Sequence, residues 1–214
     1  MPRRPAAFWQ PLGFTLILLG YLLVWLPHPA AGLSALGVEI GEWIKFLPGV
    51  RGGQAAADRN WFYLPPITLA YLMLHWTIGW PARRWQTWLA RAAAVLVSWL
   101  AFPAWESLLE EPASEWRLRL AWVGLISLSA LLIFWWPRRP AGWLDGLALA
   151  AVLAGALLPT WAYFALRPVV AQALRAPVGV GPGLWLNLIG HSLLFVCVAA
   201  QLRRRLRPTA TPHP

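Results

Sequence analysis

The sequence predicts an all-α integral membrane protein, a single domain over residues 1–214 in which six transmembrane helices form one bundle. Hydrophobic residues make up 59% of the chain and charged residues only 12%, and the mean hydropathy is positive. This composition leaves too little polar surface to solvate a globular protein. Six apolar runs also approach about twenty residues, the helical length that crosses about 30 Å of hydrocarbon. The runs are uninterrupted, whereas the strands of a β-barrel alternate apolar and polar residues.

The predicted spans cover the chain from end to end. They lie at 8–26, 62–80, 85–102, 118–136, 142–166 and 184–202, and a basic tail over 203–214 follows the last of them. For residues 1–30 there is an alternative, a cleaved secretory signal, because Arg3 and Arg4 precede an apolar core and a small-residue exit. The uninterrupted run that starts at Phe8 favours a retained span instead.

Arginine residues orient this bundle. With a cytoplasmic N-terminus, the segments on the inner side carry ten arginines, and those on the outer side carry seven charges of each sign. The inner arginines are Arg3, Arg4, Arg83, Arg84, Arg138, Arg139, Arg203, Arg204, Arg205 and Arg207. Because cytoplasmic loops of membrane proteins are enriched in Lys and Arg, we predict that both termini are cytoplasmic. The abundance of Arg, Ala and Pro suggests a GC-rich bacterial genome, so the membrane is expected to be the bacterial cytoplasmic (plasma) membrane.

The net charge of +10 does not indicate a nucleic-acid partner, because the arginines lie at hairpin tips and in a tail rather than in a separate basic domain. The expected partner is the lipid bilayer, including anionic lipids at its cytoplasmic face. Many of the 17 tryptophans flank the ends of spans, where their rings prefer the membrane interface. A protein partner or a second copy of the chain is a further expectation.

Residues 33–47, between the first two spans, predict an amphipathic helix on the outer membrane face. At about 100° per residue, Leu36, Ile40 and Ile44 share one stripe, with Glu42 and Lys45 on the other side. The segment is too short and too charged to cross a membrane, so it is expected to lie flat on the membrane or to roof the bundle.

An internal comparison indicates a possible tandem hairpin repeat. Residues 66–112 align without a gap on 122–168, and both hairpins turn at a Trp-Pro-x-Arg tip. Shared membrane composition is the alternative explanation of this similarity. If the repeat is real, the outer arms that follow the two hairpins carry opposite charge, and Glu110 or Glu111 is predicted to pair with Arg167. The alternative is two solvated loops whose ion pairs contribute little.

The outer face holds the first group of candidate functional residues. Carboxylates beside tryptophans at this interface are able to bind a sugar or a lipid head group, or to exchange protons with one. The binding candidates are Glu39, Glu42, Arg59 and Asn60, and the candidates for acid–base catalysis are Asp58 and Glu106. The alternative is a solvated charged face without a ligand.

Polar residues inside the spans form the second group, because such residues are costly in lipid and often functional. His75, Arg91 and Asp145 lie within a few residues of the cytoplasmic ends of their spans. They are therefore expected to meet in one inner polar cluster, with Asp145 as the counter-ion of Arg91. Such a cluster would suit a proton or anion path, although Arg91 and Asp145 could instead reach the interface as snorkelling side chains. His191 is expected to bond to a neighbouring helix together with Asn187, one turn earlier.

We expect no cofactor and no metal site. The single cysteine, Cys197, lies inside the last span, and the two histidines His75 and His191 differ in depth by about 9 Å, too much to share a haem.

Three functions remain open. A non-catalytic accessory or complex subunit is favoured, and the alternatives are a small transporter or channel and a membrane enzyme that acts on a lipid or lipid-linked head group at the outer face.

Overall fold

The computed structural model describes residues 6–28, 34–51, 58–132 and 142–206. Nearly all of the regular structure in these ranges is helical, which confirms the all-α class. The elements in chain order are α1 (Ala6–Leu22), β1 (Val24–Leu26), β2 (Ala35–Leu36), α2 (Gly37–Trp43), η2 (Ile44–Phe46), α3 (Pro48–Arg51), η3 (Arg59–Tyr63), α4 (Leu64–Trp76), α5 (Trp85–Ser98), η4 (Trp99–Ala101), α6 (Trp105–Glu110), α7 (Ala113–Leu132), α8 (Gly142–Leu174) and α9 (Pro182–Leu206).

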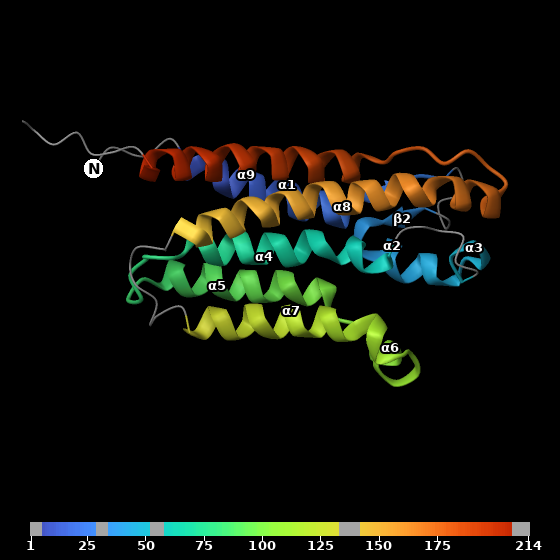
Figure 1. The fold of residues 1–214 in the computed structure, drawn as a ribbon, viewed down its shortest axis with the longest axis horizontal. Helices are drawn as coiled ribbons and strands as arrows, with labels where there is room; N and C mark the ends of the chain where they lie inside the picture. Colours follow the sequence, from blue (N-terminus) through green and yellow to red (C-terminus); the bar gives the residue numbers. More distant parts are fainter. Residues whose placement is uncertain (1–5, 29–33, 52–57, 133–141, 207–214) are drawn as a thin grey trace, which may run out of the picture.

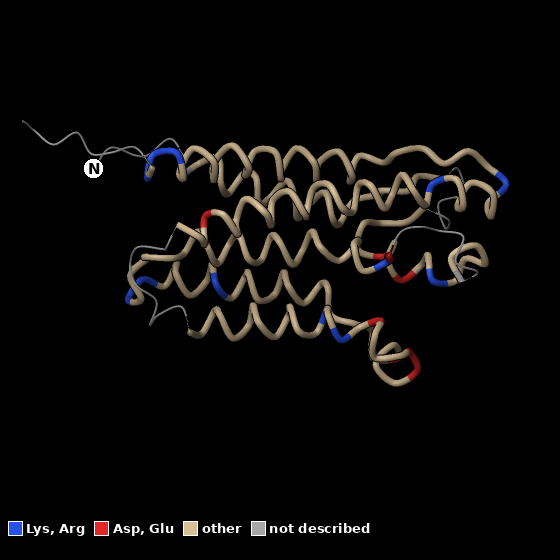
Figure 2. The backbone as a smooth tube through the Cα atoms, in the orientation of Figure 1, with Lys and Arg blue, Asp and Glu red and all other residues tan. Residues whose placement is uncertain are grey.

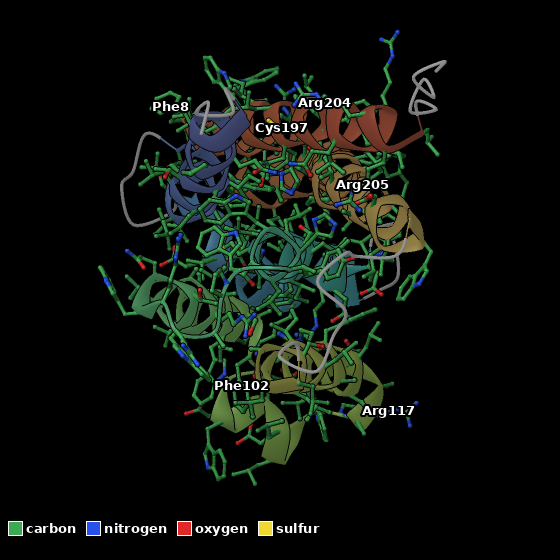
Figure 3. All side chains as sticks on the ribbon, turned by 90° about the vertical axis from the view of Figure 1, so that its left-hand side faces the viewer. Phe8, Phe102, Arg117, Cys197, Arg204 and Arg205 are labelled. Atoms are coloured by element: carbon green, nitrogen blue, oxygen red, sulfur yellow. The ribbon has the colours of Figure 1, made fainter. Side chains whose placement is uncertain are left out.

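The long helices α1, α4, α5, α7, α8 and α9 run side by side along one axis (Figure 1). Helix α1 packs on α9, α8 packs on α9 and α4, and α5 lies between α4 and α7. Figure 3 shows this order end-on, with α1 and α9 at one side of the bundle and α7 at the other. We call the end that carries α2 and α6 the outer end, after the predicted orientation, and the opposite end the inner end.

Proline and glycine residues set the ends of the central helix α4. Pro65 and Pro66 lie in its first turn, where the backbone N–H groups have no helical partner, so proline loses no hydrogen bond there. After Trp76 the chain turns at Gly79, whose φ of 81° is a left-handed conformation that glycine adopts without strain. These residues limit α4 to a shorter helix than the apolar run 62–80 predicts.

Glycines allow α1 and α9 to approach each other closely. A Cβ atom on Gly20 would lie 2.8 Å from the backbone oxygen of Gly183, and one on Gly190 would lie 2.9 Å from that of Gly13. No larger residue fits at these positions without a shift of the helices. Small residues at helix crossings are characteristic of packing between membrane helices, where backbones meet directly.

The surface between the two ends of the bundle is apolar. Large apolar side chains are exposed on α1, α5, α7, α8 and α9, which surround α4; they include Leu19, Leu96, Leu128, Leu157 and Ile189. Charged residues gather at the two ends instead (Figure 2). By length and hydropathy α8 and α9 are able to cross a membrane, which is weak evidence for a membrane location.

The structure differs from the predicted elements in several places. Helix α1 ends at Leu22, and the chain then enters β1, which pairs antiparallel with β2. Because Ala35 and Leu36 belong to this strand pair, the amphipathic helix begins at Gly37 rather than at 33, and its last turn is the 3₁₀ helix η2. Its apolar stripe faces the interior of the protein, where Ile40 and Ile44 are almost fully buried.

The two hairpins of the possible repeat adopt different conformations near their outer ends. Helix α8 continues through Pro159, whereas the aligned Pro103 lies in a break between η4 and α6. The second hairpin tip, within 133–141, lies outside the described residues. The duplication therefore stays a prediction.

Candidate functional site

Charged side chains meet at the outer end and form what we call the outer charged cluster. Its members are Glu42, Lys45, Arg59, Glu111, Glu115 and Arg119. They come from α2, η2, η3, the end of α6 and the start of α7, so the cluster joins segments that are distant in the sequence. Three members are acidic and three are basic. Their charges therefore cancel.

Glu42 is the centre of one half of this cluster. Its Oε1 accepts hydrogen bonds from Arg119 Nη1, at 3.0 Å, and from the Tyr63 hydroxyl, while its Oε2 lies 2.8 Å from Lys45 Nζ. Burial by itself would raise the pKa of Glu42, but the bonds from Lys45, Tyr63 and Arg119 outweigh burial and lower the pKa to about 2. Glu42 is therefore a carboxylate at neutral pH and cannot serve there as a general acid.

Glu111 is the centre of the other half. Its Oε1 lies 2.9 Å from Lys45 Nζ and 3.0 Å from Ser107 Oγ, and its Oε2 accepts from Arg59 Nη2. Arg59 Nε also donates to Glu115 Oε2 at 3.1 Å. Burial opposes ionisation of Glu111, but the bonds from Arg59, Lys45 and Ser107 hold its pKa below the ordinary value. Lys45 bonds to both centres and so connects the two halves.

Helical spacing explains how α7 contributes two members. Glu115 and Arg119 are four residues apart, so they lie on the same face of the helix. That face meets α2 and η3, where Glu115 reaches Arg59 and Arg119 reaches Glu42. The guanidinium of Arg119 also lies 4.1 Å from the centre of the Tyr63 ring, a cation–π contact that helps to fix its orientation.

Two of the binding residues predicted at the outer face, Glu42 and Arg59, belong to this cluster. The interpretation of Glu42 and Glu39 as one solvated face is wrong for Glu42, because that side chain points into the cluster. Glu39 is exposed, and its carboxylate accepts a hydrogen bond from the Leu36 backbone N–H at 3.1 Å. Glu39 therefore caps α2.

The other predicted outer residues lie apart from the cluster. Asp58 is exposed and accepts from the Asn60 backbone N–H at 2.9 Å, so it caps η3. Glu106 is exposed in the first turn of α6. The predicted pairing of Arg167 with Glu110 or Glu111 does not form, since Arg167 Nε donates to the Val178 backbone oxygen at 2.6 Å.

At the inner end, the structure brings together two of the three predicted polar residues. His75 Nε2 lies 3.0 Å from Asp145 Oδ1, and Arg205 Nη1 lies 2.7 Å from Asp145 Oδ2. Arg205 reaches Asp145 from the end of α9, beside α8 (Figure 3). Arg91 Nε donates to Thr77 Oγ1 at 3.3 Å. The prediction that Asp145 is the counter-ion of Arg91 is therefore wrong, because Asp145 pairs with Arg205 instead. Arg205 was assigned from the sequence to the basic tail 203–214, and its pairing with Asp145 was therefore not predicted.

A third polar group lies halfway along the bundle. His191 Nδ1 is 2.9 Å from the Asn187 backbone oxygen, and His191 Nε2 is 3.3 Å from Thr68 Oγ1. The Asn187 side chain donates to the Gly155 backbone oxygen at 3.2 Å. These bonds connect α4, α8 and α9, so the group holds three helices together as expected for His191 and Asn187.

Comparisons with family models, curated proteins and solved structures find no match for this chain. In the part of the chain that the structure describes, no group of three or more His, Cys, Asp or Glu side chains is arranged to hold a metal ion.

Proposed function

We propose that this chain is a six-span protein of the bacterial cytoplasmic membrane, with both termini in the cytoplasm, that serves as a non-catalytic subunit of a membrane complex. The apolar surface between two charged ends supports the membrane location. The long helices occupy the same six places in the chain as the predicted spans. The numerous arginines at the inner end support the orientation.

The observation that carries the non-catalytic role is the mutual neutralisation of the outer charged cluster. Its acids and bases bond to each other, and Glu42 and Glu111 have lowered pKa values because of these bonds. Acid–base catalysis near neutral pH requires a group whose pKa lies near the working pH. The cluster instead fastens α2 and η3 to the start of α7, which is a structural role.

Helix α6 and the chain just before it provide the surface for a partner. Trp99, Phe102, Trp105 and Leu109 are exposed there, Trp105 by 68% and Leu109 by 71%, and α6 projects from the bundle at the outer end (Figure 1). Exposed tryptophans and other large apolar side chains are typical of the centres of protein interfaces. We propose that this surface contacts an apolar helix of another membrane protein.

Trp105→Ser is expected to abolish copurification of the partner while the protein itself remains folded, because an exposed tryptophan contributes to an interface and not to the core. The measurement is purification from membranes in mild detergent, followed by native mass spectrometry for a stoichiometric second chain. The matched control is Trp185→Ser, an exposed tryptophan on α9 at the opposite side of the bundle. Recovery of the wild-type protein alone, or equal partner retention by both variants, would contradict the proposal.

A further inference from the structure

Arg119 has hydrogen-bond donors that the outer charged cluster does not use. Its Nη1 bonds to Glu42, but its Nε and Nη2 have no partner among the residues that the structure describes. The residue is only 2% exposed, so bulk water does not solvate these donors. Buried polar groups of native proteins are nearly always hydrogen-bonded, and an orphaned one calls for an explanation.

A second orphaned group lies on α1. The Tyr21 hydroxyl is buried, has no hydrogen-bond partner in the described part of the chain, and belongs to a residue that is 1% exposed. It lies close enough to Arg119 and Glu42 to interact electrostatically with both. A Cβ atom on Gly37 of α2 would meet the Tyr21 backbone oxygen, and one on Gly41, a turn further along, would meet the Tyr63 ring that Arg119 covers. Tyr21 and Arg119 therefore both lie near the same stretch of α2.

The chemistry of these groups selects the kind of ligand. The Nε and Nη2 hydrogens of an arginine point in parallel, so together they match two oxygens of one phosphate or carboxylate group. The oxygens of Glu42 already accept bonds from Arg119, Tyr63 and Lys45, so the region offers donors rather than acceptors. A cation would therefore find no carboxylate oxygen there that is free of other bonds.

We propose that Arg119 and Tyr21 form a binding site for a phosphate oxyanion, with the Arg119 Nε–Nη2 edge and the Tyr21 hydroxyl as donors. Glu42 and the Tyr63 ring hold the guanidinium in place on its other sides. The phosphodiester of a lipid head group and free inorganic phosphate share this chemistry. The inference adds a ligand to the proposed subunit and does not depend on the partner surface at α6.

The test uses the full chain, purified in a maltoside detergent and washed free of phospholipid. Thermal unfolding is followed by tryptophan fluorescence during titration with inorganic phosphate and, separately, with a short-chain phosphatidylglycerol. Tyr21→Phe removes one hydroxyl and nothing else, and Arg119→Lys keeps the charge but loses the parallel donors. The matched controls are Tyr71→Phe, whose hydroxyl bonds to the Leu144 backbone oxygen, and the exposed Arg117→Lys.

We expect one of the two ligands to raise the unfolding temperature of the wild-type protein and of both controls. Tyr21→Phe should weaken binding about tenfold and Arg119→Lys about a hundredfold, since each loses hydrogen bonds to a charged group. A response to inorganic phosphate identifies a site for free phosphate, and a response to phosphatidylglycerol alone identifies a head-group site. No response of the wild-type protein to either ligand would overturn the proposal. Unchanged binding by Tyr21→Phe would overturn it even if Arg119→Lys failed to fold.

Discussion

Glu42→Gln is expected to destabilise the protein by about 3 kcal/mol, the magnitude typical of removing one partner from a buried ion pair. Arg119 is almost fully buried and has Glu42 as its carboxylate partner. Glutamine keeps the shape of the side chain but not its charge, so the Arg119 guanidinium would stay buried without a counter-ion. Lys45 and Tyr63 would lose their bonds to the same carboxylate.

The measurement is unfolding in mixed detergent micelles, followed by tryptophan fluorescence. Glu39→Gln is the matched control, one helical turn away on α2, where the exposed carboxylate only caps the helix. A glutamine oxygen also accepts that capping bond, so the control should change stability by less than about 0.5 kcal/mol. Equal stability of the two variants would show that Glu42 is not a centre of the cluster.

The same substitution predicts a change in the pH dependence of stability. The pKa of Glu42 falls from an ordinary value of 4.5 to about 2 in the folded protein. A lowered folded-state pKa contributes stability above the unfolded value, and this contribution is lost as the pH falls from about 4.5 toward about 2. The stability difference between wild type and Glu42→Gln should therefore shrink across this pH range.

Gly155→Ala is expected to destabilise the protein by about 2 to 3 kcal/mol, in the upper part of the range for overpacked cores. A Cβ atom on Gly155 would lie 2.3 Å from His191 Nε2 and 2.3 Å from Thr68 Oγ1. Both side chains are buried, and the β-branched Thr68 has few alternative rotamers. The helices would have to separate, or the His191–Thr68 hydrogen bond would have to break.

Gly146→Ala is the control for this variant because it lies on the same helix, α8, and among the described residues no atom outside the local helix backbone lies within 4 Å of the new Cβ. It should leave stability unchanged or raise it by up to about 1 kcal/mol, since alanine favours helix more than glycine does. The two variants are compared by unfolding in mixed micelles. A Gly155→Ala protein as stable as the Gly146→Ala protein would contradict the close approach of α4, α8 and α9.

The positions of the long helices were predictable because a long apolar run is a local property of the sequence. Their ends were less so. Helix α7 starts at Ala113, before its apolar run at 118, because the charges of Glu115 and Arg117 lower the hydropathy without interrupting a helix. Helix α8 continues to Leu174, past the end of its apolar run at 166, for the same reason at Arg167. The β1–β2 pair was not predictable, because strands of three and two residues are too short to show an alternating pattern.

The outer charged cluster was only partly predictable because most of its bonds join distant segments. Glu42 and Lys45 are three residues apart and visible as neighbours on a helix. Arg119 and Glu42 are 77 positions apart, and Arg59 and Glu111 are 52 apart, so no spacing rule connects them. Tyr21 gave no signal at all, because one tyrosine in an apolar run is ordinary. The i, i+4 spacing of Glu115 and Arg119 was the one clue that α7 presents a charged face.

The most direct test of the six-span account is whether α5 crosses the membrane. Together α5 and η4 cover residues 85–101, about 25 Å of helix, near the lower limit for a span. In a Cys197→Ser background, single cysteines at the exposed positions Ala82 and Ala113 are placed on either side of it. Intact bacterial cells are treated with a membrane-impermeant maleimide, before and after permeabilisation. The account predicts labelling of Ala113→Cys in intact cells and of Ala82→Cys only after permeabilisation, and labelling of both from the same side would contradict it.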